Sequence, residues 1–163
     1  MRYLIGLGNP GEEYENTRHN TGRIVTTAFC EEKEFGEFEF DKKTKALTAE
    51  SKIGKEKVLA VLPETFMNNS GLSVKKIVTS SKKASDMVVI HDDIDLPFGR
   101  FKISFNRGSG GHRGLESIIK TIKTTAFLRV RIGVSPTGKK GTAKKPVGEE
   151  ALREIFGAVR RTG

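Results

Sequence analysis

Two segments of this chain hold the residue types that acid–base chemistry requires. His19, one of only three histidines, lies in the polar run Thr17-Arg18-His19-Asn20 just before the first expected helix. The run His91-Asp92-Asp93-Ile94-Asp95 follows a short apolar stretch and groups a histidine with three carboxylates. A carboxylate that accepts the Nδ1 proton of a histidine fixes the tautomer of the ring and leaves Nε2 free to remove a proton from water. His19 and Asp92 are therefore candidates for a base and its partner, with a structural contact in a loop as the alternative role of each.

Side-chain amides lie at the start of another expected helix, in the run Pro63-Glu64-Thr65-Phe66-Met67-Asn68-Asn69-Ser70-Gly71. An amide there can donate a hydrogen bond to a developing oxyanion or hold a carbonyl group. Capping of the helix is an equally good role for Asn69 and Ser70. The glycine-rich run Gly108-Ser109-Gly110-Gly111-His112-Arg113-Gly114 opens a later helix, where its backbone can approach a ligand closely. Each of these segments is weak evidence when taken alone.

The opening run Gly6-Leu7-Gly8-Asn9-Pro10-Gly11 matches the G-x-G-x-x-G pattern of dinucleotide-binding turns. A pyrophosphate needs free backbone N–H groups and a positive helix end at such a turn. Pro10 removes one donor, and the three glutamates between residues 12 and 15 add negative charge. We therefore expect no nicotinamide cofactor.

A metal centre is also disfavoured by the sequence. The carboxylates at residues 92–95 suit a divalent cation, but no H-x-x-x-H motif or second pair of carboxylates completes a ligand set. The single cysteine, Cys30, excludes an internal disulfide and is interpreted as a core residue. We expect neither a metal ion nor another cofactor.

Strands and helices alternate in the pattern of an α/β fold. We expect strands over residues 2–7, 45–53, 56–62, 87–90, 101–105 and 128–132, and helices over residues 22–34, 70–78, 115–122 and 152–159. The second and third strands should form a hairpin, and Ser70 should cap the second helix. His91 and Asp92 should lie at the carboxyl end of the fourth strand, where open α/β sheets bind ligands. Residues 135–147 are rich in lysine, glycine and proline and should form a surface loop.

The charge is distributed unevenly. Residues 1–41 contain 4 basic and 9 acidic side chains, which leaves 25 basic and 11 acidic side chains in the remainder. A positive region of this kind favours a nucleic acid as partner over a membrane, because no amphipathic anchor accompanies it. No apolar stretch is long enough to span a bilayer, and the amino terminus is too short and too rich in glycine for a signal peptide. The sequence therefore predicts one cytoplasmic domain over residues 1–163.

Taken together, these segments resemble the bacterial peptidyl-tRNA hydrolase family. The resemblance is carried by GLGNPG, Y-x-x-TRHN, P-x-TFMNNSG, HDDIDLPFG, GSGGHRG and RVRIG, which occur in that order over most of residues 1–134. It implies a monomeric, three-layer α/β/α domain with a mixed central sheet. It also implies cleavage of the ester between a peptide and the terminal ribose of its tRNA, which recycles the tRNA in translation without a metal or cofactor.

The resemblance also assigns roles to individual residues. His19 matches the catalytic base and Asp92 its carboxylate partner, while Asn9 and Asn68 match the amides that hold the peptide and polarise the scissile carbonyl. The residues that shape the cleft are Tyr14, Asn20 and Met67. A tRNA substrate accounts for the basic second half of the chain, since Lys and Arg supply phosphate contacts that are independent of sequence. The candidates for these contacts are Lys102, Arg107, Arg129 and Arg131.

One position departs from the family pattern. The glycine loop usually reads GGHNG, and here Arg113 replaces the asparagine. Asparagine both donates and accepts hydrogen bonds, whereas arginine only donates them. Arg113 is therefore expected to bring a positive charge to the substrate site near His19. This charge either makes protonation of the histidine less favourable, or binds a phosphate more tightly and slows product release.

The main alternative is an RNA-binding module without catalytic activity on the same fold, as in plant chloroplast splicing factors that resemble these hydrolases. The joint presence of His19, Asp92, Asn9 and Asn68 argues against it, because binding alone makes no chemical demand on that set. The sequence thus favours a metal-independent ester hydrolase.

Overall fold

The structure is a computed structural model that describes residues 1–136 and 150–156. Within these residues, seven strands form one sheet in the order β2-β3-β4-β1-β5-β7-β6. β1 pairs in parallel with β4 and β5, and β5 pairs in parallel with β7, whereas the β2–β3, β3–β4 and β6–β7 pairs are antiparallel. The strands are β1 (Arg2–Gly6), β2 (Glu39–Asp41), β3 (Ala46–Ile53), β4 (Glu56–Pro63), β5 (Met87–Pro97), β6 (Phe101–Phe105) and β7 (Leu128–Ser135).

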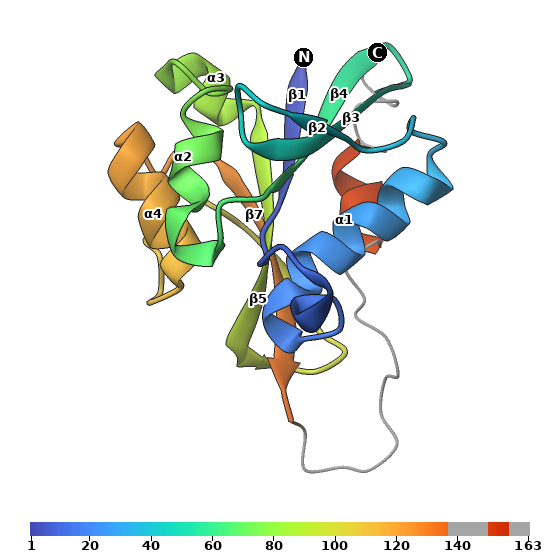
Figure 1. Ribbon diagram of the computed structural model, residues 1–163. Coiled ribbons are helices and arrows are strands. Elements are labelled where there is room, and N and C mark those ends of the chain that lie inside the picture. The colour runs from blue at the N-terminus through green and yellow to red at the C-terminus, as the bar shows by residue number, and fades with distance from the viewer. Residues whose placement is uncertain (137–149, 157–163) are drawn as a thin grey trace.

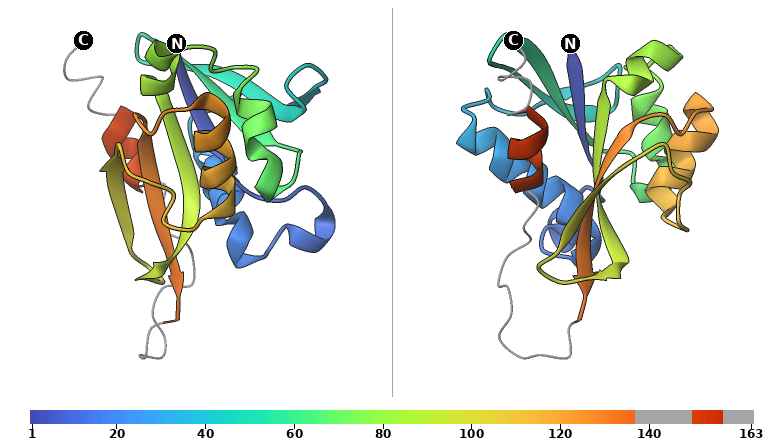
Figure 2. Two further views of the ribbon diagram at one scale, coloured as in Figure 1. Left: turned by 90° about the vertical axis from the view of Figure 1, so that its left-hand side faces the viewer. Right: turned by 180° about the vertical axis from the view of Figure 1, so that it is seen from behind.

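Helices cover both faces of this sheet (Figures 1 and 2). On one face lie α2 (Ser70–Val74), α3 (Ser81–Ser85) and α4 (Arg113–Ile122), and on the other lie α1 (Thr21–Glu32) and the helical residues 150–156. Met87 and Val89 of β5 pack in the core beneath α4, whereas Val88 and Ile90 pack in the core beneath α1. A strand with both faces buried in this way is typical of a parallel sheet between two helical layers. The predicted three-layer α/β/α fold with a mixed sheet is confirmed.

Several boundaries differ from the prediction. β5 continues to Pro97 because β7 pairs with it beyond Asp93, so His91 and Asp92 lie within the strand and not at its end. Ser70 does not cap α2: a 3₁₀ turn over Met67–Asn69 precedes this helix, and the Ser70 hydroxyl donates to the carbonyl oxygen of Met67. β2 and α3 are additional elements that the sequence did not predict.

The hairpin of β3 and β4 is confirmed. Of the loop expected over residues 135–147, Ser135 belongs to β7, and residues 137–147 lie outside the described part. The last expected helix is present over residues 150–156, and its expected remainder also lies outside that part. The single domain over residues 1–163 stays a prediction. Among the helices of residues 1–136 and 150–156, none is long and apolar enough to cross a membrane.

Candidate active site

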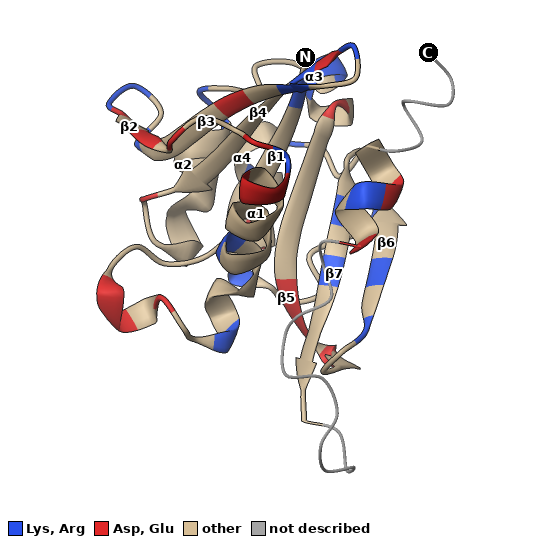
Figure 3. Cartoon of the chain, turned by 90° about the vertical axis from the view of Figure 1, so that its right-hand side faces the viewer, with Lys and Arg blue, Asp and Glu red and all other residues tan. Residues whose placement is uncertain are grey.

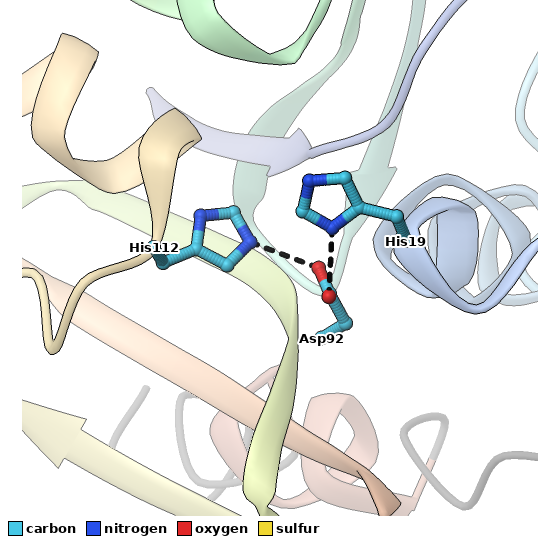
Figure 4. A group of neighbouring side chains, drawn as sticks. All are labelled: His19, Asp92 and His112. Atoms are coloured by element: carbon cyan, nitrogen blue, oxygen red, sulfur yellow. Dashed lines mark hydrogen bonds and ion pairs between the residues drawn. The ribbon is translucent and has the colours of Figure 1, made fainter.

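The carboxylate of Asp92 lies between two histidine rings (Figure 4). His19 Nδ1 is 2.7 Å from Asp92 Oδ2, and His112 Nε2 is 2.8 Å from Asp92 Oδ1. The side chains of Asp92 and His112 are each only 8% exposed, whereas that of His19 is 41% exposed. The structure therefore brings together His19 and Asp92, which are 73 residues apart in the chain, and leaves the outer edge of the His19 ring open to solvent.

Close packing of α1 against β1 and β5 makes this meeting possible. β1 ends at Gly6, which pairs with Ile90, so Asp92 projects beyond the end of its neighbouring strand. His19 lies in the 3₁₀ turn Arg18–Asn20 that leads into α1. At Gly22, a Cβ atom would lie 2.3 Å from the carbonyl oxygen of Ile90, and at Gly6 it would lie 2.8 Å from the carbonyl oxygen of Gly22. These glycines thus serve contact between the helix and the strands, which gives part of the G-x-G-x-x-G match a structural explanation.

The backbone at the start of α4 fixes the tautomer of His112. His112 is the N-cap of this helix, and its Nδ1 accepts from the N–H groups of Gly114 at 3.1 Å and Leu115 at 3.3 Å. A ring nitrogen that accepts carries no proton, so the proton of the neutral ring is on Nε2 and is donated to Asp92. Asp92 consequently accepts Nε2–H from His112 and faces Nδ1 of His19. In a neutral His19 ring with its proton on Nδ1, Nε2 is able to act as a base.

Asp92 is ionised in this setting. Burial alone raises the pKa of its carboxyl, but the hydrogen bonds from His112 and His19 outweigh burial and hold that pKa well below its usual range. An anion at this position stabilises the positive charge that His19 gains when it accepts a proton.

His91, the third histidine, contacts the backbone of Asp92 and the ring of His112. The residue is only 3% exposed, and its Nδ1–H donates to the backbone carbonyl of Asp92 at 2.8 Å. Burial first, and then the neighbouring His112, lower the pKa of His91 to about 4, so its ring is neutral near pH 7. The rings of His91 and His112 meet edge to face with centroids 4.9 Å apart. All three histidines of the chain therefore meet around Asp92.

The same three ligand groups satisfy the distance requirement of a metal site but not its protonation requirement. One ligand atom each from His19, Asp92 and His112 lies within 4.8 Å of the others. A metal ion at His112 Nε2 would displace the proton to Nδ1, which faces the two N–H donors of α4. Histidine ligands usually donate the other N–H to a carboxylate, a carbonyl or water, and among the described residues no acceptor takes that place. The donor set is therefore a poor fit for a metal ion.

Asn20 holds the backbone of Asn9 with two hydrogen bonds. Asn20 Oδ1 accepts from the Asn9 N–H at 2.7 Å, and Asn20 Nδ2 donates to the Asn9 carbonyl at 2.8 Å. The side-chain Oδ1 of Asn9 in turn accepts from the N–H of Met67 at 2.7 Å. Among the described residues, Nδ2 of Asn9 has no acceptor, so the free part of this amide is a donor.

The other residues expected to bind substrate lie around this amide. Met67 Sδ and His112 Cε1 lie 2.6 and 3.1 Å from the position that a Cβ on Gly114 would occupy, so the segment with Asn9 and Met67 adjoins the histidines. Asn68 is exposed, and its side chain forms no hydrogen bond within the described residues. The Tyr14 ring meets Phe66 edge to face at 6.4 Å. Phe66 itself is half exposed and has a φ of 65° and a ψ of 155°, a conformation that costs a non-glycine residue free energy.

A cleft of about 990 Å³ opens beside the histidines, and five cationic residues line it. Lys102 lies opposite Arg131, and Ser104 opposite Arg129, on the neighbouring strands β6 and β7, along which basic residues recur in Figure 3. Arg131 Nε is 2.7 Å from Asp93 Oδ2, and buried Arg129 donates to the carbonyl of Gly108 at 2.6 Å. Two of the four predicted phosphate contacts are therefore already bound within the protein. The cationic residues that line the cleft are Lys102, Arg107, Arg113, Arg129 and Arg131.

Sequence reasoning did not assign a role to His112 or a supporting role to His91. The available signal was that the chain has only three histidines. His91 directly precedes the candidate carboxylate Asp92, and His112 lies in the glycine-rich run. The cap formed by Nδ1 of His112 depends on the direction of the chain at the start of α4, which composition does not reveal.

Comparison with known proteins places this geometry in context. The family model described as Peptidyl-tRNA hydrolase matches residues 3–148. The peptidyl-tRNA hydrolase of Syntrophotalea carbinolica is 40% identical over 156 residues, which are 94% of this chain and 81% of that protein. That of Aquifex aeolicus is 40% identical over 149 residues, which are 90% and 76% of the two chains. The crystal structure of peptidyl-tRNA hydrolase from Acinetobacter baumannii superposes with a TM-score of 0.78 at 31% identity, over 95% of this chain and 82% of that one.

Proposed function

This chain belongs to the peptidyl-tRNA hydrolase family, and from that premise we propose that it hydrolyses the ester between a peptide, or an N-acylated amino acid, and the terminal ribose of a tRNA. The observation that carries the proposal is the pair formed by His19 and ionised Asp92, in which Nδ1 of His19 faces the carboxylate and the ring is accessible. Release of the tRNA for further translation is the consequence of that reaction.

In the proposed mechanism, Nε2 of His19 removes a proton from a water molecule as the water oxygen attacks the ester carbonyl. Asp92 keeps the His19 ring in the required tautomer and stabilises its positive charge. The free N–H groups of Asn9 and Asn68 donate to the carbonyl oxygen as it becomes negative. The bond from carbon to the ribose oxygen then breaks, and that oxygen takes the proton from His19. Tyr14, Asn20 and Met67 complete the cleft wall, with Asn20 acting through Asn9.

We propose that the reaction uses no metal ion. The support is the tautomer of His112, because a metal ion at Nε2 would force the proton onto Nδ1, which faces two backbone N–H donors. Assay in excess chelator tests this directly: unchanged turnover is expected, and loss of turnover that added zinc restores would contradict it.

The basic wall of the cleft is proposed to bind the phosphates near the acceptor end of the tRNA. Exposed Lys102 and Arg107 have no ion-pair partner within residues 1–136 and 150–156 and are the stronger candidates. Arg131 is partly exposed beside Asp93. Arg129 is only 4% exposed, so it contributes positive charge to the cleft without direct contact with a phosphate. We also propose that the protein is cytoplasmic and acts as a monomer. Sedimentation with and without tRNA tests the monomeric state.

The defining experiment uses an N-acetylated aminoacyl-tRNA with a labelled acyl group. Release of the label by the purified protein in chelator-containing buffer is expected. Tight binding of this tRNA without any release would instead establish the RNA-binding module as the function of the chain.

A further inference from the structure

Arg113 is a cationic residue of the cleft whose charge nothing in the described residues neutralises. It is exposed, it lines the same cleft as His19 and Asp92, and it forms no ion pair there. Glu116 is the acidic residue in the first turn of α4, and it accepts a hydrogen bond from the Ser109 hydroxyl at 3.4 Å. The guanidinium of Arg113 therefore remains available to an anion.

The place of Arg113 in α4 is unfavourable for stability. It is the first residue of the helix, where the peptide dipoles create partial positive charge and a cation is destabilising. A residue that conflicts with its local structure, without a compensating contact, points to a functional constraint. Because the adjacent His112 is anchored on Asp92, the backbone of Arg113 is fixed at the edge of the cleft that His19 and Asp92 also line.

We propose that Arg113 binds the phosphate of the terminal nucleotide of the tRNA, and so retains the product tRNA in the cleft after the ester is cut. This inference rests on the proposed function. In such a substrate, the phosphate on the terminal nucleotide is the one nearest the ester that His19 attacks. Arginine matches a phosphate with a planar pair of donors, which gives a stronger and more directional contact than a single point charge.

Three forms of tRNA without an acyl group test the contact: the complete tRNA, one that ends one nucleotide short with a 3′-hydroxyl, and one that ends at the same place with a 3′-phosphate. The wild type is expected to bind the shortened tRNA with the 3′-phosphate about 3- to 10-fold more tightly than the one without it. Arg113→Gln is expected to lose this preference. The slope of the logarithm of its binding constant against the logarithm of the salt concentration should also be shallower by about 0.7, as for the loss of one phosphate contact to a single strand.

Lys82→Gln is the matched control, because Lys82 is an exposed lysine of α3, before the opposite end of β5. It removes the same unit of charge and should keep the wild-type preference. Equal preference for the 3′-phosphate in the wild type and Arg113→Gln would overturn the contact. Arg113→Lys should keep the salt dependence but lose most of the preference.

Turnover tests the retention of product. With the ester substrate, Arg113→Gln is expected to weaken inhibition by complete deacylated tRNA about 3- to 10-fold. Unchanged inhibition by deacylated tRNA would refute retention. Failure of the wild type to cut the ester would refute the proposed function and, with it, product retention. The phosphate contact would still be tested by the binding measurements, because these require no hydrolysis.

Discussion

Lowering the pH from 7 to 4.5 should destabilise the protein through His91. The ring is buried, and protonation would place a second N–H where no acceptor faces it among the described residues, beside His112 and the positive charge of Arg129. The folded-state pKa is therefore lowered from 6.5 to about 4. Because this pKa is depressed, the contribution of His91 to stability is complete above pH 6.5 and is lost as the pH falls toward the folded-state pKa.

The size of this effect follows from the two pKa values. At pH 4.5 most unfolded chains bind a proton at His91 and most folded chains do not, which corresponds to a loss of about 2 to 3 kcal/mol in the free energy of unfolding. The assay is denaturant unfolding at both pH values for the wild type and for His91→Asn, which removes the titrating ring.

The wild type should lose about 2 to 3 kcal/mol more than His91→Asn between these two pH values. The comparison of the two losses removes the contribution of carboxyl groups that titrate in both proteins. An equal loss in both would show that the His91 ring takes up its proton in the folded state as readily as in the unfolded chain, and would refute the reasoning.

Three further substitutions test how the site is built. His112→Ala should lower kcat up to about 100-fold, because Asp92 is misplaced, and should destabilise the protein by about 1 kcal/mol, because α4 loses its cap. His112→Asn should restore the cap but not kcat. A kcat equal to that of the wild type in either variant would contradict this role of His112. Asn20→Ala should lower the free energy of unfolding by about 1 to 3 kcal/mol and also lower kcat, because the partly buried N–H and carbonyl groups of Asn9 lose their partners. An unfolding curve and a kcat like those of the wild type would be the contrary result. Gly22→Ala should destabilise by about 1 to 3 kcal/mol and slow hydrolysis, since its Cβ would push α1 away from β5, and normal stability in thermal unfolding would count against that account.

The fold followed from the sequence where periodicity decided the structure. The apolar run of β5 and the alternating residues of β6 and β7 predicted their strands, and the spacing of Leu115, Ile118 and Ile122 predicted α4. The extent of β5 could not be predicted, because its polar residues after Ile90 are held by pairing with β7.

The site was predicted less completely than the fold. The resemblance named His19 and Asp92, and the structure brings them into contact. Arg129 was a candidate for a phosphate contact, but it is buried and donates to the carbonyl of Gly108 in the glycine loop. Contacts of this kind depend on loop conformation, which local composition does not determine.

The most direct test of the account is the single-turnover rate of ester cleavage in the wild type and in His19→Ala, with tRNA binding measured in parallel. The account predicts that the wild type cleaves the ester and that His19→Ala binds tRNA equally well but cleaves it at least about 100-fold more slowly. Cleavage by His19→Ala at the wild-type rate would show that another group activates the water and would contradict the assignment of His19 as the base.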